Sequence, residues 1–252
     1  MARRRGVAGG GAAILWAEKL QTIMGSIADN LQAVGARIAA ASRSVGRDPG
    51  SVRLLAVSKT WPAACVREAV AAGQRAFGEN YVQEATAKLA ELADLDLEWH
   101  FIGPLQSNKT RAVAAGFDWV HSVDRLHIGE RLSAQRPTGR GPLNVCVQVN
   151  ISDETSKSGC APAAALPLAL AVAKLPNLRL RGLMTVPAPS DDEAVQRAAC
   201  RALRVVFDEL RAAGLDVDTL SMGMSHDLEA AIAEGATIVR VGTAIFGERK
   251  HS

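Results

Sequence analysis

Lys59 stands directly after a short apolar run and is followed at once by Thr60, Trp61 and Pro62. A continuous apolar run bounded by turn signals, here residues 54–58, predicts a strand that is buried on both faces. A lysine at the carboxyl end of such a strand has two interpretations. It can mark the point where the strand reaches solvent, or it can be a desolvated amine that forms a Schiff base with an aldehyde.

Two later stretches have the composition of a phosphate site. SMGMS (221–225) follows one predicted strand and opens a helix, and Gly242-Thr243 follows the next strand and opens a helical turn. Backbone N–H groups at the start of a helix bind anions well when hydroxyl groups lie beside them. The alternative is that Ser225 is only an N-cap and Gly242 only a turn residue. Their joint position after the last two predicted strands favours a phosphate site.

Arg240 lies inside a predicted apolar strand, in the run IVRVG (238–242). A guanidinium does not deprotonate in a protein, so it needs a hydrogen-bond acceptor or an aromatic nitrogen lone pair. Structural pairing with Glu79 or Asp153 is the alternative. A lysine that binds an aldehyde, a phosphate site and an inward arginine together suggest pyridoxal 5′-phosphate (PLP), with the arginine facing the pyridine nitrogen.

The elements that must position these residues alternate between strand and helix. A helix expected at 23–43 comes first and carries apolar residues at helical spacing. Strands are expected at 54–59, 75–77, 98–102, 119–122, 143–150, 178–184, 219–222 and 237–241, with helices at 62–72, 81–93, 108–115, 125–135, 162–174, 191–213 and 226–234.

This alternation predicts a parallel sheet with right-handed crossovers. Eight strands close a barrel with a packed interior, and such barrels take about 250 residues, close to the 252 of this chain. An open doubly wound sheet is the main competitor, but it usually has a glycine-rich loop after its first strand, and residues 59–62 contain no glycine. We therefore predict an α/β protein with a single (β/α)8 barrel of the TIM type and an extra N-terminal helix.

Composition narrows the partners and the compartment. The net charge of +3 is accounted for by three arginines at 3–5, and no basic stripe with interleaved aromatics indicates nucleic-acid binding. No apolar run is long enough to predict a membrane span. The four cysteines at 65, 146, 160 and 200 lack metal-ligand spacing, so we expect no metal, reduced thiols and a cytoplasmic protein. Residues 1–23 are expected to be a leader, either disordered or upstream of the true start at Met24, and residues 24–249 the barrel domain.

Six segments resemble those of one family. They are LLAVSKTWP (54–62), FGENYVQEA (77–85), WHFIGPLQSNKTR (99–111), VNISDETSKSG (149–159), RGLMTVP (181–187) and SMGMSHDLEAAIAEGATIVRVGTAIFG (221–247). They are similar to those of the pyridoxal phosphate homeostasis proteins, the YggS/PROSC family, which are single-domain relatives of the alanine racemase barrel. The resemblance covers about residues 24 to 249.

The resemblance implies a monomeric barrel that holds PLP as a Schiff base on Lys59. It implies a carrier or buffer of PLP in vitamin B6 homeostasis, with PLP-dependent enzymes that lack their cofactor as recipients and with no catalytic residue. The cofactor contacts that it implies are the phosphate ligands Ser221, Gly242 and Thr243, with Met222 and Gly223 beside them, Arg240 near the pyridine nitrogen, and Asn80 and His100 along the ring.

A PLP-dependent amino-acid racemase or related enzyme is the alternative function. Racemisation needs two acid/base groups on opposite faces of the substrate carbanion. In alanine racemase a tyrosine of an additional carboxyl-terminal domain serves the second face. The single tyrosine here is Tyr81, and the chain ends soon after its last barrel segment, so we expect no such domain and no turnover.

Four further residues carry secondary expectations. His226 stands where the family commonly has an acidic residue, and we expect it in the first turn of a helix beside the phosphate. Lys157, in the loop 152–159, is considered as a second aldehyde acceptor. His121 and His127 are expected to be structural histidines.

Overall fold

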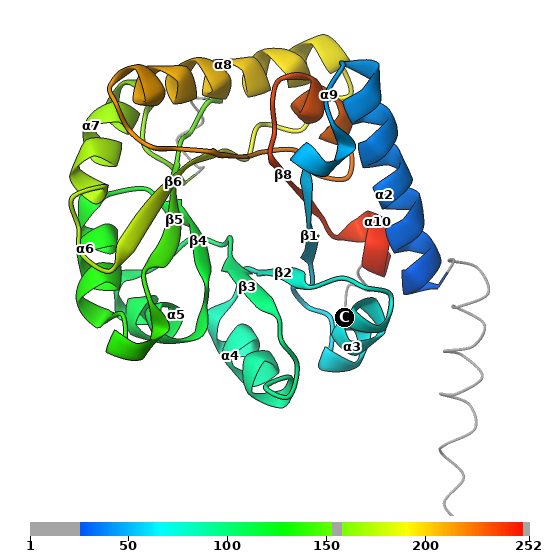
Figure 1. Ribbon diagram of the computed structural model, residues 1–252, viewed down its shortest axis with the longest axis horizontal. Coiled ribbons are helices and arrows are strands. Elements are labelled where there is room, and N and C mark those ends of the chain that lie inside the picture. The colour runs from blue at the N-terminus through cyan, green and yellow to red at the C-terminus, as the bar shows by residue number, and fades with distance from the viewer. Residues whose placement is uncertain (1–25, 153–157, 249–252) are drawn as a thin grey trace, which may run out of the picture.

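Eight parallel strands close into a ring that is surrounded by helices (Figure 1). The computed structural model describes residues 26–152 and 158–248. Each strand pairs with the next along the chain, and β8 (Ile238–Val241) pairs with β1 (Arg53–Val57) to close the barrel. The predicted (β/α)8 barrel with an additional N-terminal helix is confirmed.

The other strands and the helices alternate as expected. The strands are β2 (Ala76–Glu79), β3 (Glu98–Phe101), β4 (Trp119–Val123), β5 (Leu143–Gln148), β6 (Leu178–Met184) and β7 (Thr219–Ser221). The helices are α2 (Ile27–Ser44), α3 (Ala63–Ala71), α4 (Val82–Glu91), α5 (Thr110–Gly116), α6 (Leu126–Gln135), α7 (Pro162–Val172), α8 (Glu193–Ala212), α9 (Leu228–Ala233) and α10 (Thr243–Phe246). Within the described ranges no helix is long and apolar enough to cross a membrane.

Helix α2 covers one side of the barrel from the outside. It begins with a capping box in which the Ser26 hydroxyl accepts from the Asp29 N–H and the Asp29 carboxylate accepts from the Ser26 N–H, each at 3.1 Å. Its apolar stripe, which includes Val34 and Ile38, is buried, and the helix lies beside α9 and α10 (Figure 1). The expected start at residue 23 falls outside the described residues.

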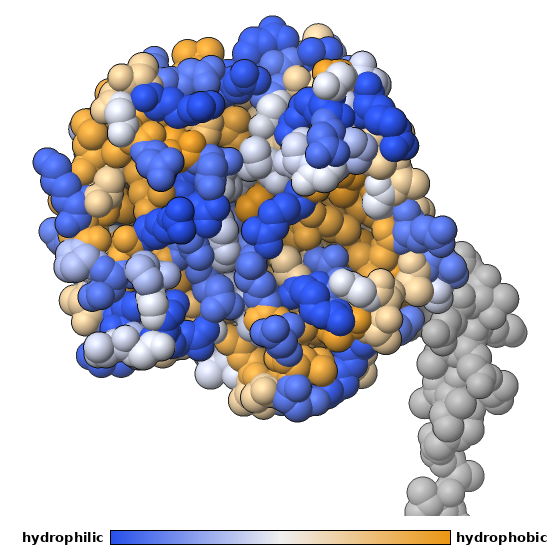
Figure 2. Space-filling model, viewed as in Figure 1, coloured by the Kyte–Doolittle hydropathy of each residue, from blue (hydrophilic) through white to orange (hydrophobic). Residues whose placement is uncertain are grey.

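The two faces of the barrel wall bury different kinds of side chain. Alternate strand residues such as Phe77, Val145 and Val239 belong to the large apolar core shared with the helices. A second, small apolar cluster of Trp119, Cys146 and Met184 is separate from this core. Figure 2 shows hydrophilic residues over the middle of the barrel, with apolar residues between them and the outer helices.

Strand β1 ends sooner than the sequence predicts. It stops at Val57, and Lys59 lies in the turn that follows. The Ser58 N–H still donates to the Gly78 carbonyl at 3.0 Å, but Thr60 adopts a left-handed conformation with φ of 69°. This conformation cannot continue a strand, so it turns the chain out of the sheet at Lys59.

Candidate functional site

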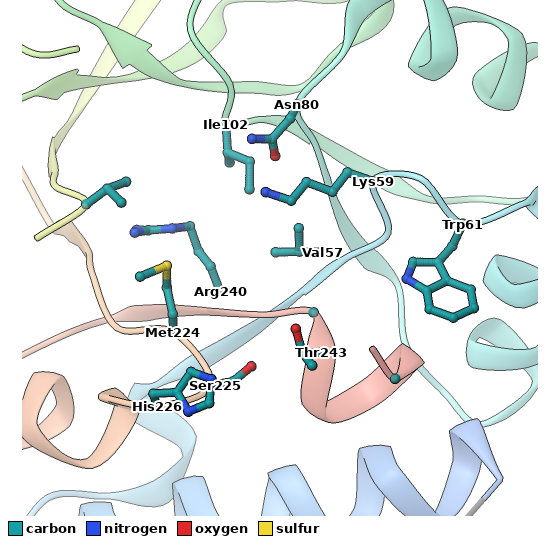
Figure 3. Close-up of a pocket in the computed structure, with 13 residues that line it drawn as sticks. Val57, Lys59, Trp61, Asn80, Ile102, Met224, Ser225, His226, Arg240 and Thr243 are labelled. Atoms are coloured by element: carbon teal, nitrogen blue, oxygen red, sulfur yellow. The ribbon is translucent and has the colours of Figure 1, made fainter. Parts of the chain in front are cut away.

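A pocket of about 250 Å³ lies at the carboxyl ends of the strands (Figure 3). Its walls come from the loops after β1, β2, β3, β6, β7 and β8, and from the strand residues Val57 and Arg240. This is the end at which barrels of this kind build their functional sites. The structure brings Lys59, Asn80, Arg240, Gly242 and Thr243 to this pocket, five of the residues singled out in the sequence.

Lys59 reaches into the pocket from the turn after β1. Figure 3 shows its side chain extended toward Arg240, with its amine among Val57, Asn80 and Ile102. Lys59 is only partly exposed, and two of these three neighbours are apolar. The solvent-marking interpretation of this lysine therefore does not describe its position, because the amine ends inside a pocket.

A buried ion pair holds the residues on both sides of Lys59. Lys88 of α4 donates to Glu79 of β2 at 2.6 Å and to the Ser58 carbonyl at 2.8 Å. The Ser58 hydroxyl donates to Glu79 at 2.7 Å, and the Thr60 N–H donates to Glu84 at 2.6 Å. Glu79 is fully buried, which raises its pKa, while the Lys88 ammonium opposes that shift.

Arg240 is buried in β8, where it is the register partner of Leu55 in β1. Its Nη1 donates to the Ser221 carbonyl at 2.5 Å and to the Ser221 hydroxyl at 2.8 Å, and its Nη2 donates to the Thr185 carbonyl at 2.8 Å. The alternative pairing with Glu79 is wrong, because that carboxylate binds Lys88. Burial lowers the pKa of Arg240 to about 10, which leaves the guanidinium charged near neutral pH.

Asn80 follows β2 and offers an unused acceptor to the pocket. Its Oδ1 is buried without a hydrogen-bond partner among the described residues. A buried unsatisfied oxygen is costly unless a ligand or water supplies the donor. Gly103 makes this placement possible, because a Cβ there would lie 2.2 Å from the Asn80 carbonyl oxygen.

Ser225 and Thr243 place hydroxyl groups at one end of the pocket (Figure 3). Thr243 begins α10, so its N–H and that of Ala244 have no acceptor within the helix. The loop before α9 is fixed by the Met224 N–H, which donates to Asp227 at 2.6 Å, and by Arg37, which donates to the Ser225 carbonyl at 3.1 Å. Hydroxyls and N–H groups are the donors that a phosphate requires.

Four other expected contact residues do not line the pocket. Ser221 and His100 are buried beneath it, where Ser221 binds Arg240 and His100 binds His121. Met222 is fully buried in the core. Gly223 packs against α9, since a Cβ there would lie 2.6 Å from the Cβ of Ala231. The expected contacts therefore differ in part from the residues that line the pocket, although Ser221, Met222 and Gly223 lie in the run that leads to the lining residues Met224 and Ser225.

The loop after β7 corrects two further expectations. His226 lines the pocket but lies in a turn, because α9 begins at Leu228 and not at residue 226. Ser225 is not the N-cap of this helix, since Asp227 occupies that position. Lys157 and Asp153 lie outside the described residues. Among those described, no group of three or more His, Cys, Asp or Glu could hold a metal ion.

The pocket lining also includes five loop residues that are not among the contacts predicted from the sequence: Trp61, Ile102, Val186, Met224 and Ser225. All of them lie in loops that follow the carboxyl ends of strands. For the four residues other than Ser225, position was the available signal. Ser225 also had the right chemistry for an anion, because it is the second hydroxyl residue of the SMGMS run.

Comparisons with known proteins agree with this barrel. The family described as "Alanine racemase, N-terminal domain" matches residues 30–250. The chain is 64% identical over 228 residues to the "Pyridoxal phosphate homeostasis protein" of Pseudomonas aeruginosa, covering 90% of this chain and 98% of that one. It is 55% identical over 232 residues to the protein of the same name in Escherichia coli K12, covering 91% and 99%.

A solved structure extends the comparison. PipY of Synechococcus elongatus with PLP bound superposes with a TM-score of 0.76 at 43% identity, covering 88% of this chain and 100% of that one. The closed barrel and the family match place the chain in the class of alanine racemase N-terminal barrels. The chain belongs to the alanine racemase N-terminal domain family and, within it, to the pyridoxal phosphate homeostasis proteins.

Proposed function

We propose that this chain binds PLP and acts in PLP homeostasis as a carrier or buffer, with the cofactor held as a Schiff base on Lys59. The observation that carries the proposal is the convergence of three kinds of group on one pocket: the Lys59 amine, the Arg240 guanidinium and the hydroxyls of Ser225 and Thr243. The relatives named for PLP homeostasis and the PLP-bound PipY structure support it.

Each group fits one part of the cofactor. Lys59 would bind the aldehyde carbon, and Ser225, Gly242 and Thr243 would hold the phosphate. Asn80, with its unpaired buried Oδ1, would accept a hydrogen bond beside the lysine. Val57, Ile102 and Met224 supply apolar surface for a flat ring.

Arg240 would face the pyridine nitrogen. When bound, PLP supplies an aldehyde to the lysine and a ring that can withdraw electrons from attached groups. A charged guanidinium can only donate hydrogen bonds, so it favours a ring nitrogen without a proton and weakens that withdrawal.

We do not assign a racemase activity. Tyr81 is 53% exposed and does not line the pocket, so it is not placed as a second base. His226 does line the pocket, but it lies beside Ser225, at the end away from Lys59 (Figure 3). Neither residue supplies an acid/base group opposite the lysine amine.

We further propose that one chain suffices and that it acts in the cytoplasm. All four cysteines are free thiols, which supports a reducing compartment. PLP-dependent enzymes that lack their cofactor are the proposed recipients.

Titration with PLP, followed by absorbance spectroscopy, tests the binding. We expect a visible absorbance band that saturates at one PLP per chain in the wild type and in Lys174→Ala, an exposed control, and no such band in Lys59→Ala. Transfer is tested by mixing the loaded protein with an apo PLP-dependent enzyme and measuring recovery of that enzyme's activity. Sustained formation of D-amino acid or keto acid from L-amino acids, above the rate with free PLP, would contradict the carrier role.

A further inference from the structure

A line of hydrogen bonds crosses the barrel beneath the pocket. It joins Arg240 Nη1 to Ser221 Oγ at 2.8 Å, and Ser221 Oγ to His121 Nδ1 at 2.8 Å. It continues from His121 Nε2 to His100 Nδ1 at 2.9 Å and from His100 Nε2 to Glu98 Oε1 at 2.5 Å. His121 is on β4 and Ser221 on β7, which are not neighbours in the ring, so the bond between them spans the interior.

The donor and acceptor atoms of these side chains determine which partner donates in each hydrogen bond of the line. Arg240 has no acceptor atom, so Ser221 Oγ must accept from it. The Ser221 hydroxyl then donates to His121 Nδ1, because no other acceptor for its hydrogen is found in the described part of the chain. A neutral His121 therefore has its proton on Nε2 and donates to His100 Nδ1. His100 in turn has its proton on Nε2 and donates to the Glu98 carboxylate.

The far end of the line supports the same direction. Glu98 also accepts from Arg53 at 2.8 Å, and its side chain is 35% exposed. The hydrogen bond from His100 is the main cause that lowers the pKa of Glu98 to about 2, so this carboxylate is an acceptor at neutral pH. Burial lowers the pKa of both histidines, which favours neutral rings with one proton each.

We propose that His100 and His121 are positioning residues for Arg240: through Ser221 they hold its guanidinium in one orientation toward the PLP ring. The inference rests on the proposed function, because the guanidinium matters there for the ring nitrogen that it would face. Neither histidine lines the pocket; they act by turning the lone pairs of Ser221 toward Arg240. If either ring carried its proton on Nδ1, the Ser221 hydroxyl would have to turn elsewhere.

Four charged groups lie near the two histidines, at different ends of the line of hydrogen bonds. Arg53 and Glu98 lie at one end, Asp118 precedes β4, and Arg240 lies at the other end. Trp119 stacks on His100 with ring centroids 5.2 Å apart and is itself covered by the guanidinium of Arg181 at 4.7 Å. This packing leaves the rings little freedom to flip. Glu98 is the carboxylate that is directly bonded to the line, and as an acceptor it keeps the proton of His100 on Nε2.

Nuclear magnetic resonance of the full chain without PLP tests the direction of the line. Long-range ¹H–¹⁵N spectra at pH 7 are expected to show His100 and His121 as neutral rings with the proton on Nε2. The exposed ring of His127 provides an internal reference. A proton on Nδ1 of either buried ring, in a neutral or a charged form, would overturn the proposal. This result does not depend on PLP binding, so it is separate from a failure of the proposed function.

Variants test the effect on the ligand. Ser221→Ala and His121→Phe are each expected to weaken PLP binding about tenfold and to shift the absorbance of bound PLP, because each removes a hydrogen bond that orients a charged group. The double variant is expected to be no worse than either single one, since both break the same line. Ser122→Ala is the control, because the Ser122 hydroxyl is buried without a hydrogen-bond partner among the described residues.

The controls for folding complete the experiment. Thermal unfolding without PLP identifies variants that fail to fold. If His121→Phe does not fold, Ser221→Ala and the nuclear magnetic resonance spectra of the unmodified chain still test the positioning role. A Ser221→Ala variant that matches Ser122→Ala in affinity and absorbance would overturn the positioning role. So would effects of the two substitutions that add in the double variant.

Discussion

Lys59 and Arg240 reach the same pocket because β8 closes the barrel against β1, where Arg240 is the register partner of Leu55. The amine arrives from the first strand and the guanidinium from the last. A barrel that stayed open between these strands would leave the two side chains on opposite edges of a sheet. Closure of the ring is therefore what brings Lys59 and Arg240 to one pocket.

Loss of the Thr243 hydroxyl is expected to weaken the binding of PLP but not of pyridoxal, which lacks the phosphate. A hydrogen bond to a charged group contributes about 1.5–3 kcal/mol, so Thr243→Ala should raise the dissociation constant of PLP roughly tenfold or more. Thr243→Ser keeps the hydroxyl and should bind PLP almost as the wild type does. If Thr243→Ala weakened the binding of PLP and of pyridoxal equally, the phosphate would not be bound by Thr243.

Removal of one member of the Glu79–Lys88 pair is expected to destabilise the fold strongly. Lys88→Met would leave the Glu79 carboxylate buried without a cation, which costs about 3–5 kcal/mol in the free energy of unfolding. The double variant Glu79→Gln/Lys88→Met should recover part of this loss. Asp94→Asn, which breaks the exposed pair with Arg67, is the control and should change little in urea unfolding. Similar losses for Lys88→Met and Asp94→Asn would show that the buried pair is not needed.

The contribution of Glu98 to stability is expected to depend on pH. Its pKa falls from 4.5 to about 2 in the folded chain, because His100 and Arg53 bind the ionised form. A lowered pKa means stabilisation that is present above pH 4.5 and is lost as the pH falls toward 2. Glu98→Gln should therefore be less stable than the wild type at pH 7, with the difference shrinking below pH 4.5. A difference that is constant from pH 7 to acid would contradict this origin.

The cysteines are expected to react slowly in the folded protein. Burial raises the pKa of Cys146 and Cys200 to about 12 and that of Cys160 to about 11, and it also raises the pKa of Cys65. Few thiolates are then present at pH 8, and the thiolate is the reactive form. A thiol reagent should label the native chain slowly and all four cysteines after unfolding. Rapid labelling of Cys146 in the native chain would contradict the buried position.

Much of the barrel can be predicted from the sequence because strands and helices alternate regularly along the chain. Short apolar runs alternate with amphipathic helices, and the polar residues gather after the carboxyl ends of the runs. That position alone selects Lys59, Asn80, Gly242 and Thr243 as pocket residues. The arginine in β8 also stands out in the sequence, since an arginine is rarely buried in an apolar strand without a partner.

The rest depends on which way each side chain points. Successive strand residues face opposite sides of the wall, so a shift of one residue at a strand end exchanges a pocket contact for a buried one. The resemblance implies Ser221 as a phosphate contact, whereas the structure buries Ser221 against Arg240 and brings Ser225, at the other end of the same SMGMS run, to the pocket lining. His121 and Ser221 meet because the closed ring brings β4 and β7 to face each other across its interior, which no local pattern can show.

Reduction of the loaded protein with borohydride, followed by peptide mass spectrometry, tests the central claim most directly. Borohydride fixes a Schiff base as a stable amine, so the modified residue keeps the mass of a pyridoxyl phosphate group. We predict one such group per chain, on the peptide that contains Lys59, and none in Lys59→Ala. A modified peptide that lacks Lys59, or an unmodified chain after saturation with PLP, would contradict the proposed role of this lysine.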